Sequence, residues 1–257
     1  MKNVFLCGDD KRFIECKKYL KKDKINTLII NKISDIDKEI KPQIIVLPIS
    51  GINVITSLYH YLFSKFNDAL FLYYNLTDEM KKSFDEYHLN SLDLSQNFKF
   101  SKENNIATAE ASLKYIIENI NKNFKDTKVA ILGYGKCGKE VYDLYKKLGM
   151  KCNVFVRREE VKNKLNEDGF FLNELSELIE LYDLIVNTIP SNVIDIDMLH
   201  KISLNTVLLD LSSYPYGWNH EVASYLGLYS YILKGLPAKH RYISIGKELA
   251  NVIRESI

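Results

Sequence analysis

The residues that most clearly suggest chemistry are three glycines at positions 133, 135 and 138, which form a G-x-G-x-x-G pattern. An apolar run over 129–132 precedes them and an amphipathic segment over 136–148 follows, so they are expected where a strand turns into a helix. There the first glycine allows a tight turn, the second lets a pyrophosphate approach the backbone, and the third lets helix and strand pack closely. The helix N-terminus would offer its N–H groups to the phosphates. We interpret the pattern as a dinucleotide site, the alternative being a turn that is merely rich in glycine.

Two arginines, Arg157 and Arg158, follow the next expected strand, which covers 152–156. NAD-binding folds usually place an acidic residue about 20 residues after the glycine pattern, where it contacts the ribose hydroxyls. Here no carboxylate stands at the strand tip, although Glu159 and Glu160 follow. Guanidinium groups bind a 2′-phosphate through charge-assisted hydrogen bonds. The pair therefore predicts NADP, with NAD the less favoured cofactor, and the alternative is a solvated basic pair at a helix start.

Further turn residues follow the later strands of the second half. The segment Asn187–Ser191 ends a buried strand, and Asp210–Ser213 ends the next one. In an open α/β sheet, ligands bind outside the carboxyl ends of the strands, so these segments are expected to line one edge. The predicted cofactor-binding residues are Gly133, Tyr134, Gly135, Lys136, Cys137, Gly138, Arg157, Arg158, Thr188, Ile189, Pro190, Leu211 and Gly235.

Two segments that contain basic residues are candidates to hold an anionic group. One is the loop over 234–241, before the last helix, and the other follows the first strand at residues 8–12. The alternative for the loop is a solvated connection that opens a helix. The sequence assigns no catalytic acid or base. The candidates are Asp9, Lys11, Arg12, Lys239 and Arg241.

The histidines and cysteines show no metal-ligand spacing, and there is no C-x-x-C pair, so we predict no metal site. No G-x-S-x-G nucleophile motif is present either. We expect reduced thiols, as is usual in the cytoplasm, for the four cysteines. They are Cys7, Cys16, Cys137 and Cys152.

Strand-like and helix-like segments alternate through both halves of the chain, which is typical of a parallel α/β protein. The first half includes an expected helix over 52–66 and a poorly patterned stretch over 89–106. We predict a flavodoxin-like N-terminal α/β domain and a doubly wound Rossmann domain. The expected limits are 1–107 for the N-terminal, substrate-side domain, 108–124 for a linking helix, 125–242 for the NADP-binding Rossmann domain, and 243–257 for a C-terminal helix.

Composition limits the function classes. The chain has 257 residues, 46% of them hydrophobic and 26% charged, which is ordinary for a globular protein. Its net charge of +2 gives no bulk electrostatic reason to expect nucleic acid or an anionic membrane as partner. The first apolar stretch is too short for a signal peptide, so we expect a cytoplasmic protein.

Taken together and in order, several segments resemble the A-type subunit of dipicolinate synthase from endospore-forming bacteria. The glycine pattern is shared by many dehydrogenases, but the combined order is more specific. The matching segments are Gly8–Asp9 with Lys11–Arg12, 47–50, 104–110, the Gly133 pattern with Arg157, 187–191, 209–213, 235–237 and 249–253.

The resemblance implies an N-terminal α/β domain and a Rossmann domain, related in plan to the 2-hydroxyacid and alanine dehydrogenases. It implies that the chain acts with a flavoprotein-like B-type subunit to oxidise dihydrodipicolinate to dipicolinate, a spore solute. The hydride would pass to the nicotinamide. A dicarboxylate substrate would be bound by cationic side chains in the cleft, and the candidates are Lys11, Arg12, Lys239 and Arg241. We also expect a homo-oligomer.

The chain departs from the usual pattern of the family at Tyr214, Tyr216, Ala238 and Tyr242. Two alternatives therefore stay open. One is another NAD(P)-dependent oxidoreductase that acts on an amino or hydroxy acid. The other is a nucleotide-binding partner subunit without catalysis.

Overall fold

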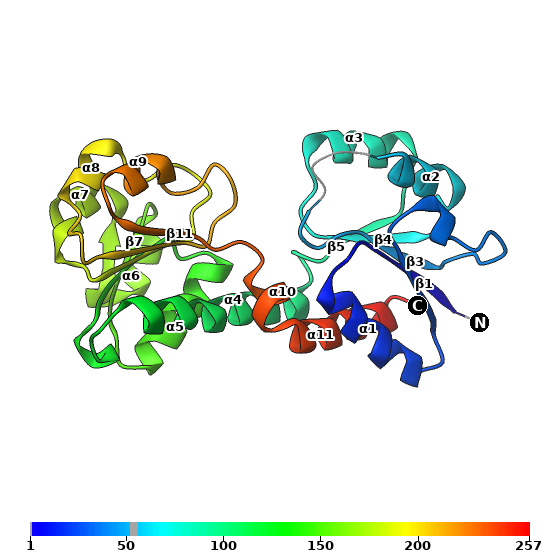
Figure 1. The fold of residues 1–257 in the computed structure, drawn as a ribbon, viewed down its shortest axis with the longest axis horizontal. Coiled ribbons are helices and arrows are strands. Elements are labelled where there is room, and N and C mark those ends of the chain that lie inside the picture. Colours follow the sequence, from blue (N-terminus) through cyan, green and yellow to red (C-terminus); the bar gives the residue numbers. More distant parts are fainter. Residues whose placement is uncertain (1, 52–55) are drawn as a thin grey trace. The chain divides into compact units, whose positions relative to one another are not determined.

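A computed structural model describes residues 2–51 and 56–257. The chain forms two compact units. Unit 1 comprises Met1–Asn104 and Pro237–Ile257, and unit 2 comprises Asn105–Leu236. Each unit contains one parallel sheet with helices packed against it (Figure 1). None of the helices in the described part of the chain has the length and apolarity that a membrane-crossing segment needs.

The sheet of unit 1 has five strands in the order β2-β1-β3-β4-β5, all parallel. This is the flavodoxin-like order. One face of the sheet, with Phe5 and Phe71, packs on Phe63 of α2 and Phe84 of α3, and α1 packs against α11. The elements are β1 (Asn3–Cys7), α1 (Lys11–Lys22), β2 (Asn26–Ile30), β3 (Ile44–Val46), α2 (Ser57–Lys65), β4 (Leu70–Tyr73), α3 (Asp78–Glu86), β5 (Ser91–Asp93) and α11 (Tyr242–Glu255).

The sheet of unit 2 has six parallel strands in the order β11-β10-β9-β6-β7-β8, which is the doubly wound Rossmann order. Side chains alternate between its faces, so Ile131 joins a cluster with Val141 of α5, and Leu132 joins another with Leu199 of α8. The elements are β6 (Lys128–Leu132), α5 (Lys136–Lys147), β7 (Lys151–Val156), α6 (Glu159–Lys164), β8 (Gly169–Phe171), α7 (Leu175–Leu178), β9 (Leu184–Asn187), α8 (Ile196–Lys201), β10 (Val207–Asp210), α9 (His220–Tyr225) and β11 (Tyr229–Ile232).

Two helices contain residues of both units, namely α4 (Phe98–Asn119) and α10 (Leu236–His240). Short 3-10 turns complete the chain at Ile33–Asp35, Phe124–Asp126, Asn166–Asp168, Leu172–Glu174 and Ile179–Leu181. The two parallel sheets confirm the predicted fold class, an α/β protein with two Rossmann-like domains.

Several elements differ from their expected limits. Helix α4 begins at Phe98, well before the expected start at 108, because the Asn97 side chain accepts the Phe100 N–H (3.0 Å) and caps it there. The expected helix over 52–66 is seen as α2, and residues 52–55 lie outside the described residues.

The C-terminal helix α11 packs within unit 1. A Cβ on Gly246 would lie 2.6 Å from the Arg12 carbonyl oxygen, so only glycine allows α11 to approach α1 this closely. The last residues of the chain thus complete the unit that the first residues begin.

Candidate functional site

The glycine turn lies between β6 and α5, as expected, and its geometry requires two of its glycines. Gly133 has a φ of +95°, and a Cβ there would lie 2.8 Å from Thr188 Oγ1. A Cβ on Gly138 would lie 2.3 Å from the Gly133 carbonyl oxygen, closer than any side chain allows. The turn therefore has the close helix–strand packing that a dinucleotide fold needs.

Gly135 serves a different purpose from its two neighbours. It is the N-cap residue of α5 and has no side chain of its own that could cap the first N–H groups of the helix. A Cβ on Gly135 would meet nothing within 4 Å, so its surface faces open space. The first N–H groups of a helix have no partner within it, and they favour negative charge. A pyrophosphate fits this end of α5.

A cleft of about 400 Å³ opens in front of the glycine turn. The end of β9 is held against β6, because both the N–H and the hydroxyl of Thr188 donate to the Leu132 carbonyl oxygen, at 3.0 and 2.9 Å. The cleft thus combines three strand ends of the sheet. It is lined by Gly133, Tyr134, Gly135, Val156, Arg157, Arg158, Val161, Thr188, Ile189 and Pro190.

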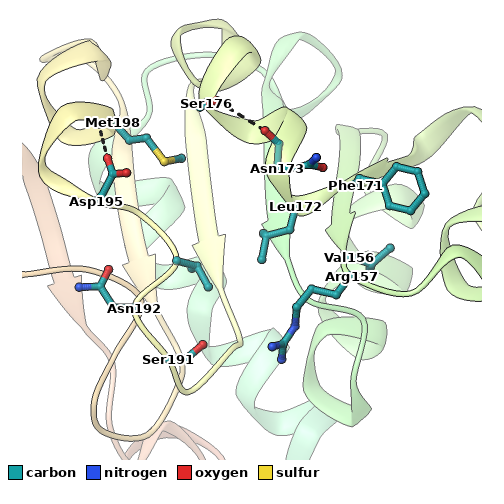
Figure 2. Close-up of a pocket in the computed structure, with 11 residues that line it drawn as sticks. Val156, Arg157, Phe171, Leu172, Asn173, Ser176, Ser191, Asn192, Asp195 and Met198 are labelled. Carbon is teal, nitrogen blue, oxygen red and sulfur yellow. Dashed lines mark hydrogen bonds between the residues drawn. The ribbon is translucent and has the colours of Figure 1, made fainter.

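A larger pocket of about 850 Å³ shares Val156 and Arg157 with this cleft. Figure 2 shows Arg157 extending from the end of β7 into the space of the pocket. The remaining wall combines polar residues, among them Asn173, Ser176 and Asp195, with apolar ones such as Leu172 and Met198. Asp195 caps α8 by accepting the Met198 N–H at 2.8 Å. The two cavities together suit an extended ligand that passes Arg157.

Sequence reasoning identified Arg157 and Ser191 of this larger pocket but missed most of its other residues. Asn173 and Ser176 follow β8, a strand of three residues that shows no clear pattern in the sequence. Asn192 and Asp195 lie just beyond Ser191, the last residue of the predicted segment 187–191. A search for polar residues after every strand end would have found them.

Five predicted cofactor residues line neither cavity. Lys136, Cys137 and Gly138 form the first turn of α5, while Leu211 follows β10 and Gly235 follows β11. All five remain at the carboxyl edge of the same sheet. Burial raises the pKa of the Cys137 thiol to about 12, so this thiol stays neutral.

The substrate candidates lie in unit 1. Arg12 is buried, and its guanidinium Nη2 lies 2.6 Å from Asp10 Oδ2, with a second hydrogen bond from Nε at 3.0 Å. Its charge is therefore already balanced within the protein. Lys11 lies exposed beside the Tyr242 ring, with Nζ 5.7 Å from the ring centre.

The remaining candidates are more accessible than Arg12. Asp9, Lys239 and Arg241 are exposed. Lys239 belongs to α10, and Arg241 occupies the N-cap position of α11. The structure thus brings all five substrate candidates into unit 1 and leaves four of them at its surface.

Comparison with known proteins finds a family model and a relative that match this chain. Residues 92–209 match the model of the NAD-binding domain of D-isomer-specific 2-hydroxyacid dehydrogenases. The A-type subunit of dipicolinate synthase from Bacillus subtilis (strain 168) is 29% identical over 153 residues, which cover 58% of this chain and 52% of that protein. The chain is similar to the A-type subunit of dipicolinate synthase. The resemblance seen in the sequence is thereby confirmed, although the aligned stretch spans only about half of the relative's length.

Solved structures show the same fold over nearly the whole chain. The A-type subunit of dipicolinate synthase from Bacillus halodurans has a TM-score of 0.87 at 23% identity, covering 98% of this chain and 96% of that one. Its counterpart in the dipicolinate synthase of Bacillus subtilis has a TM-score of 0.83 at 20% identity, covering 99% and 96%. D-2-hydroxyisocaproate dehydrogenase has a TM-score of 0.63 at 10% identity, covering 100% and 96%. At these identities the structural matches speak for the fold alone.

Proposed function

We propose that this chain is the NADP-dependent subunit of a dipicolinate synthase and oxidises dihydrodipicolinate to dipicolinate together with a flavoprotein-like B-type subunit. The observation that carries the proposal is the open cleft at Gly135 with Arg157 on its wall, in a chain that is similar to the A-type subunit of dipicolinate synthase. The match to the dehydrogenase NAD-binding domain supports the broader class of NAD(P)-dependent oxidoreductases.

The residues of the cleft fit a dinucleotide. The N-terminus of α5 would hold the pyrophosphate, and Thr188 and Pro190 would line the path of the nicotinamide half. Arg157 and Arg158, both exposed at the end of β7, would bind the 2′-phosphate. A bound NADP would supply the hydride acceptor.

The substrate would be a dicarboxylate held by exposed cations. Of the four candidate cations, Lys11, Lys239 and Arg241 are exposed, whereas Arg12 is neutralised by Asp10. A buried guanidinium gains little from a further anion when its charge is already balanced, as the charge of Arg12 is by Asp10. We therefore assign the carboxylates to the three exposed cations and give Arg12 the task of fixing the turn after β1.

A second function has its own support. The match to D-isomer-specific 2-hydroxyacid dehydrogenases favours an oxidoreductase of hydroxy acids as the second candidate. Both functions use the same cofactor cleft and differ in the anion that is oxidised.

The test is turnover of the purified chain with NADP, followed by nicotinamide absorbance. The substrates are dihydrodipicolinate and a panel of 2-hydroxy and amino acids, each with and without the flavoprotein-like subunit. Reduction of NADP by dihydrodipicolinate supports the proposal, and dependence on the second subunit shows the partnership. Turnover of a hydroxy acid alone supports the second function. NADPH binding without any turnover indicates a subunit that binds nucleotide but does not catalyse.

A further inference from the structure

A fully buried carboxylate lies at the end of β10, outside both cavities. Asp210 accepts the backbone N–H groups of Ser212 (2.9 Å) and Gly217 (2.6 Å) and the Ser212 hydroxyl (2.7 Å). Burial alone would raise the pKa of Asp210, but hydrogen bonds from His220, Gly217 and Ser212 outweigh it and hold the pKa below its usual value. Asp210 is thus an ionised acceptor that orders the loop over 211–219.

The same carboxylate is linked to the loop that follows β9. The Asn187 side-chain nitrogen donates to Asp210 Oδ1 (3.1 Å) and to the Ile189 carbonyl oxygen (2.9 Å). Its side-chain oxygen accepts the Ile189 N–H at 2.9 Å. Asn187 is fully buried, so these bonds have no competition from water. The first residues after β9 therefore depend on Asp210 through Asn187.

Gly217 holds the other end of the loop that follows β9 by hydrogen bonds to its backbone. Its carbonyl oxygen accepts the N–H groups of Val193 (2.8 Å) and Ile194 (2.9 Å). Gly217 itself is held by Asp210, and a Cβ on it would lie 2.5 Å from the Asn187 side-chain nitrogen. Both ends of the segment 188–194 are thus connected to one carboxylate.

The segment 188–194 forms a wall of both cavities. Thr188, Ile189 and Pro190 line the smaller cleft, and Ser191, Asn192 and Val193 line the larger pocket. Asp210 lines neither of them. A change at Asp210 would therefore reach a bound ligand through the shape of this segment.

His220 supports the carboxylate from the start of α9. Its Nε2 lies 3.4 Å from Asp210 Oδ2, and its Nδ1 lies 2.8 Å from Ser230 Oγ. Trp218 Nε1 donates to the same Ser230 oxygen at 2.9 Å. With the proton on Nε2, His220 donates to Asp210 and accepts from Ser230, so every member of this hydrogen-bond series is satisfied. The imidazole thus holds the second carboxylate oxygen in place.

We propose that Asp210, supported by His220, is a positioning residue that holds the segment 188–194 in the shape that receives the dinucleotide. The proposal rests on the cofactor site proposed above. It assigns a function in cofactor binding to two residues that do not touch the cofactor.

The test compares Asp210→Asn and His220→Phe with the wild type by NADPH titration, using nicotinamide fluorescence. An asparagine cannot accept from all the donors around position 210, and a phenylalanine keeps a flat ring at position 220 but loses both hydrogen bonds. Asp168→Asn is the matched control, because Asp168 accepts from Tyr142 (2.7 Å) and Lys146 (2.7 Å) in the same unit but lines neither cavity.

We expect the Kd for NADPH to rise about tenfold in Asp210→Asn, which corresponds to ~1.4 kcal/mol, and by a smaller factor in His220→Phe. The control should keep the wild-type Kd. In turnover, KM for NADP should rise while kcat at saturating NADP is kept. A merely structural defect would lower kcat through loss of folded protein and would leave KM unchanged.

Wild-type Kd values in both variants would overturn the positioning role while leaving the cofactor site intact. If Asp210→Asn does not fold, the Kd of His220→Phe for NADPH alone decides: a raised Kd supports the positioning role, and a wild-type Kd overturns it. A wild-type protein that binds neither NADPH nor NADH overturns the cofactor site itself, and the positioning role with it.

Discussion

In the proposed cofactor site, we expect the choice between NADP and NAD to depend on Arg157, an exposed side chain that both cavities share. Arg157 lies at the end of β7 on the wall of the cleft and of the larger pocket, and Arg158 lines the cleft alone. Replacing Arg157 with alanine removes a guanidinium without disturbing the core, because the side chain is exposed. We expect this variant to lose affinity for NADPH and to keep its affinity for NADH.

The size of the loss follows from the exposure of Arg157. Hydrogen bonds to charged groups contribute about 1.5–3 kcal/mol each, and solvent screening places an exposed arginine at the lower end. A loss of about 1.5 kcal/mol weakens NADPH binding by roughly tenfold. Arg157→Ala combined with Arg158→Ala should weaken it further, toward about a hundredfold. NADH carries a hydroxyl at the 2′ position, so its Kd should change much less.

The assay is calorimetric titration with NADPH and with NADH at low and high salt. Lys151→Ala is the matched control, because Lys151 begins β7, the strand that ends beside Arg157, and is also exposed. It removes the same charge from the opposite end of the strand. If Arg157→Ala binds NADPH as tightly as the control does, or if its affinities for NADPH and NADH fall equally, Arg157 does not bind the 2′-phosphate.

Three further predictions concern the same unit. Gly138→Ala should lower the free energy of unfolding by about 1–3 kcal/mol, because its Cβ would lie 2.3 Å from the Gly133 carbonyl oxygen. Urea unfolding measures this loss, and an unchanged unfolding midpoint would contradict the prediction. Tyr145→Phe should lower the free energy of unfolding by about 1 kcal/mol, since the buried Tyr145 hydroxyl lies 2.6 Å from Ser112 Oγ. An unchanged free energy of unfolding would mean that this hydrogen bond contributes nothing to stability. Finally, the pKa of Asp210 is lowered in the folded state, so its ionisation stabilises the fold above the unfolded-state pKa of about 3.9 and this contribution is lost as pH falls through the folded pKa. The stability gap between the wild type and Asp210→Asn, from urea unfolding at several pH values, should therefore shrink in acid, and a constant gap would count against it.

The parts of the candidate site that could be predicted from the sequence are those recognised by the spacing of neighbouring residues. The glycine turn needs only neighbouring residues to be recognised, and Gly133, Gly135 and Arg157 all line the cleft. The parallel order of both sheets follows from alternating strands and helices, since parallel strands need crossover connections.

The remaining features depend on contacts between distant residues. The pairing of Arg12 with Asp10 turns a candidate substrate cation into a buried ion pair, and no spacing rule shows that Arg12 will be buried. The larger pocket depends on β8, whose three residues carry too little periodicity to be recognised. The network at Asp210 joins residues from β9, β10 and α9, which only the folded chain brings together.

We propose that a dinucleotide lies against the N-terminus of α5, and the sharpest probe of this site is the variant Gly135→Ala. Gly135 has a φ of −78°, which any residue adopts, and a Cβ there meets nothing within 4 Å, so the variant should keep the wild-type Tm. The added methyl group would occupy the space that the pyrophosphate needs. We expect Gly135→Ala to bind NADPH at least about tenfold more weakly than the wild type does, measured by fluorescence titration. A variant that binds NADPH with the wild-type Kd would contradict it.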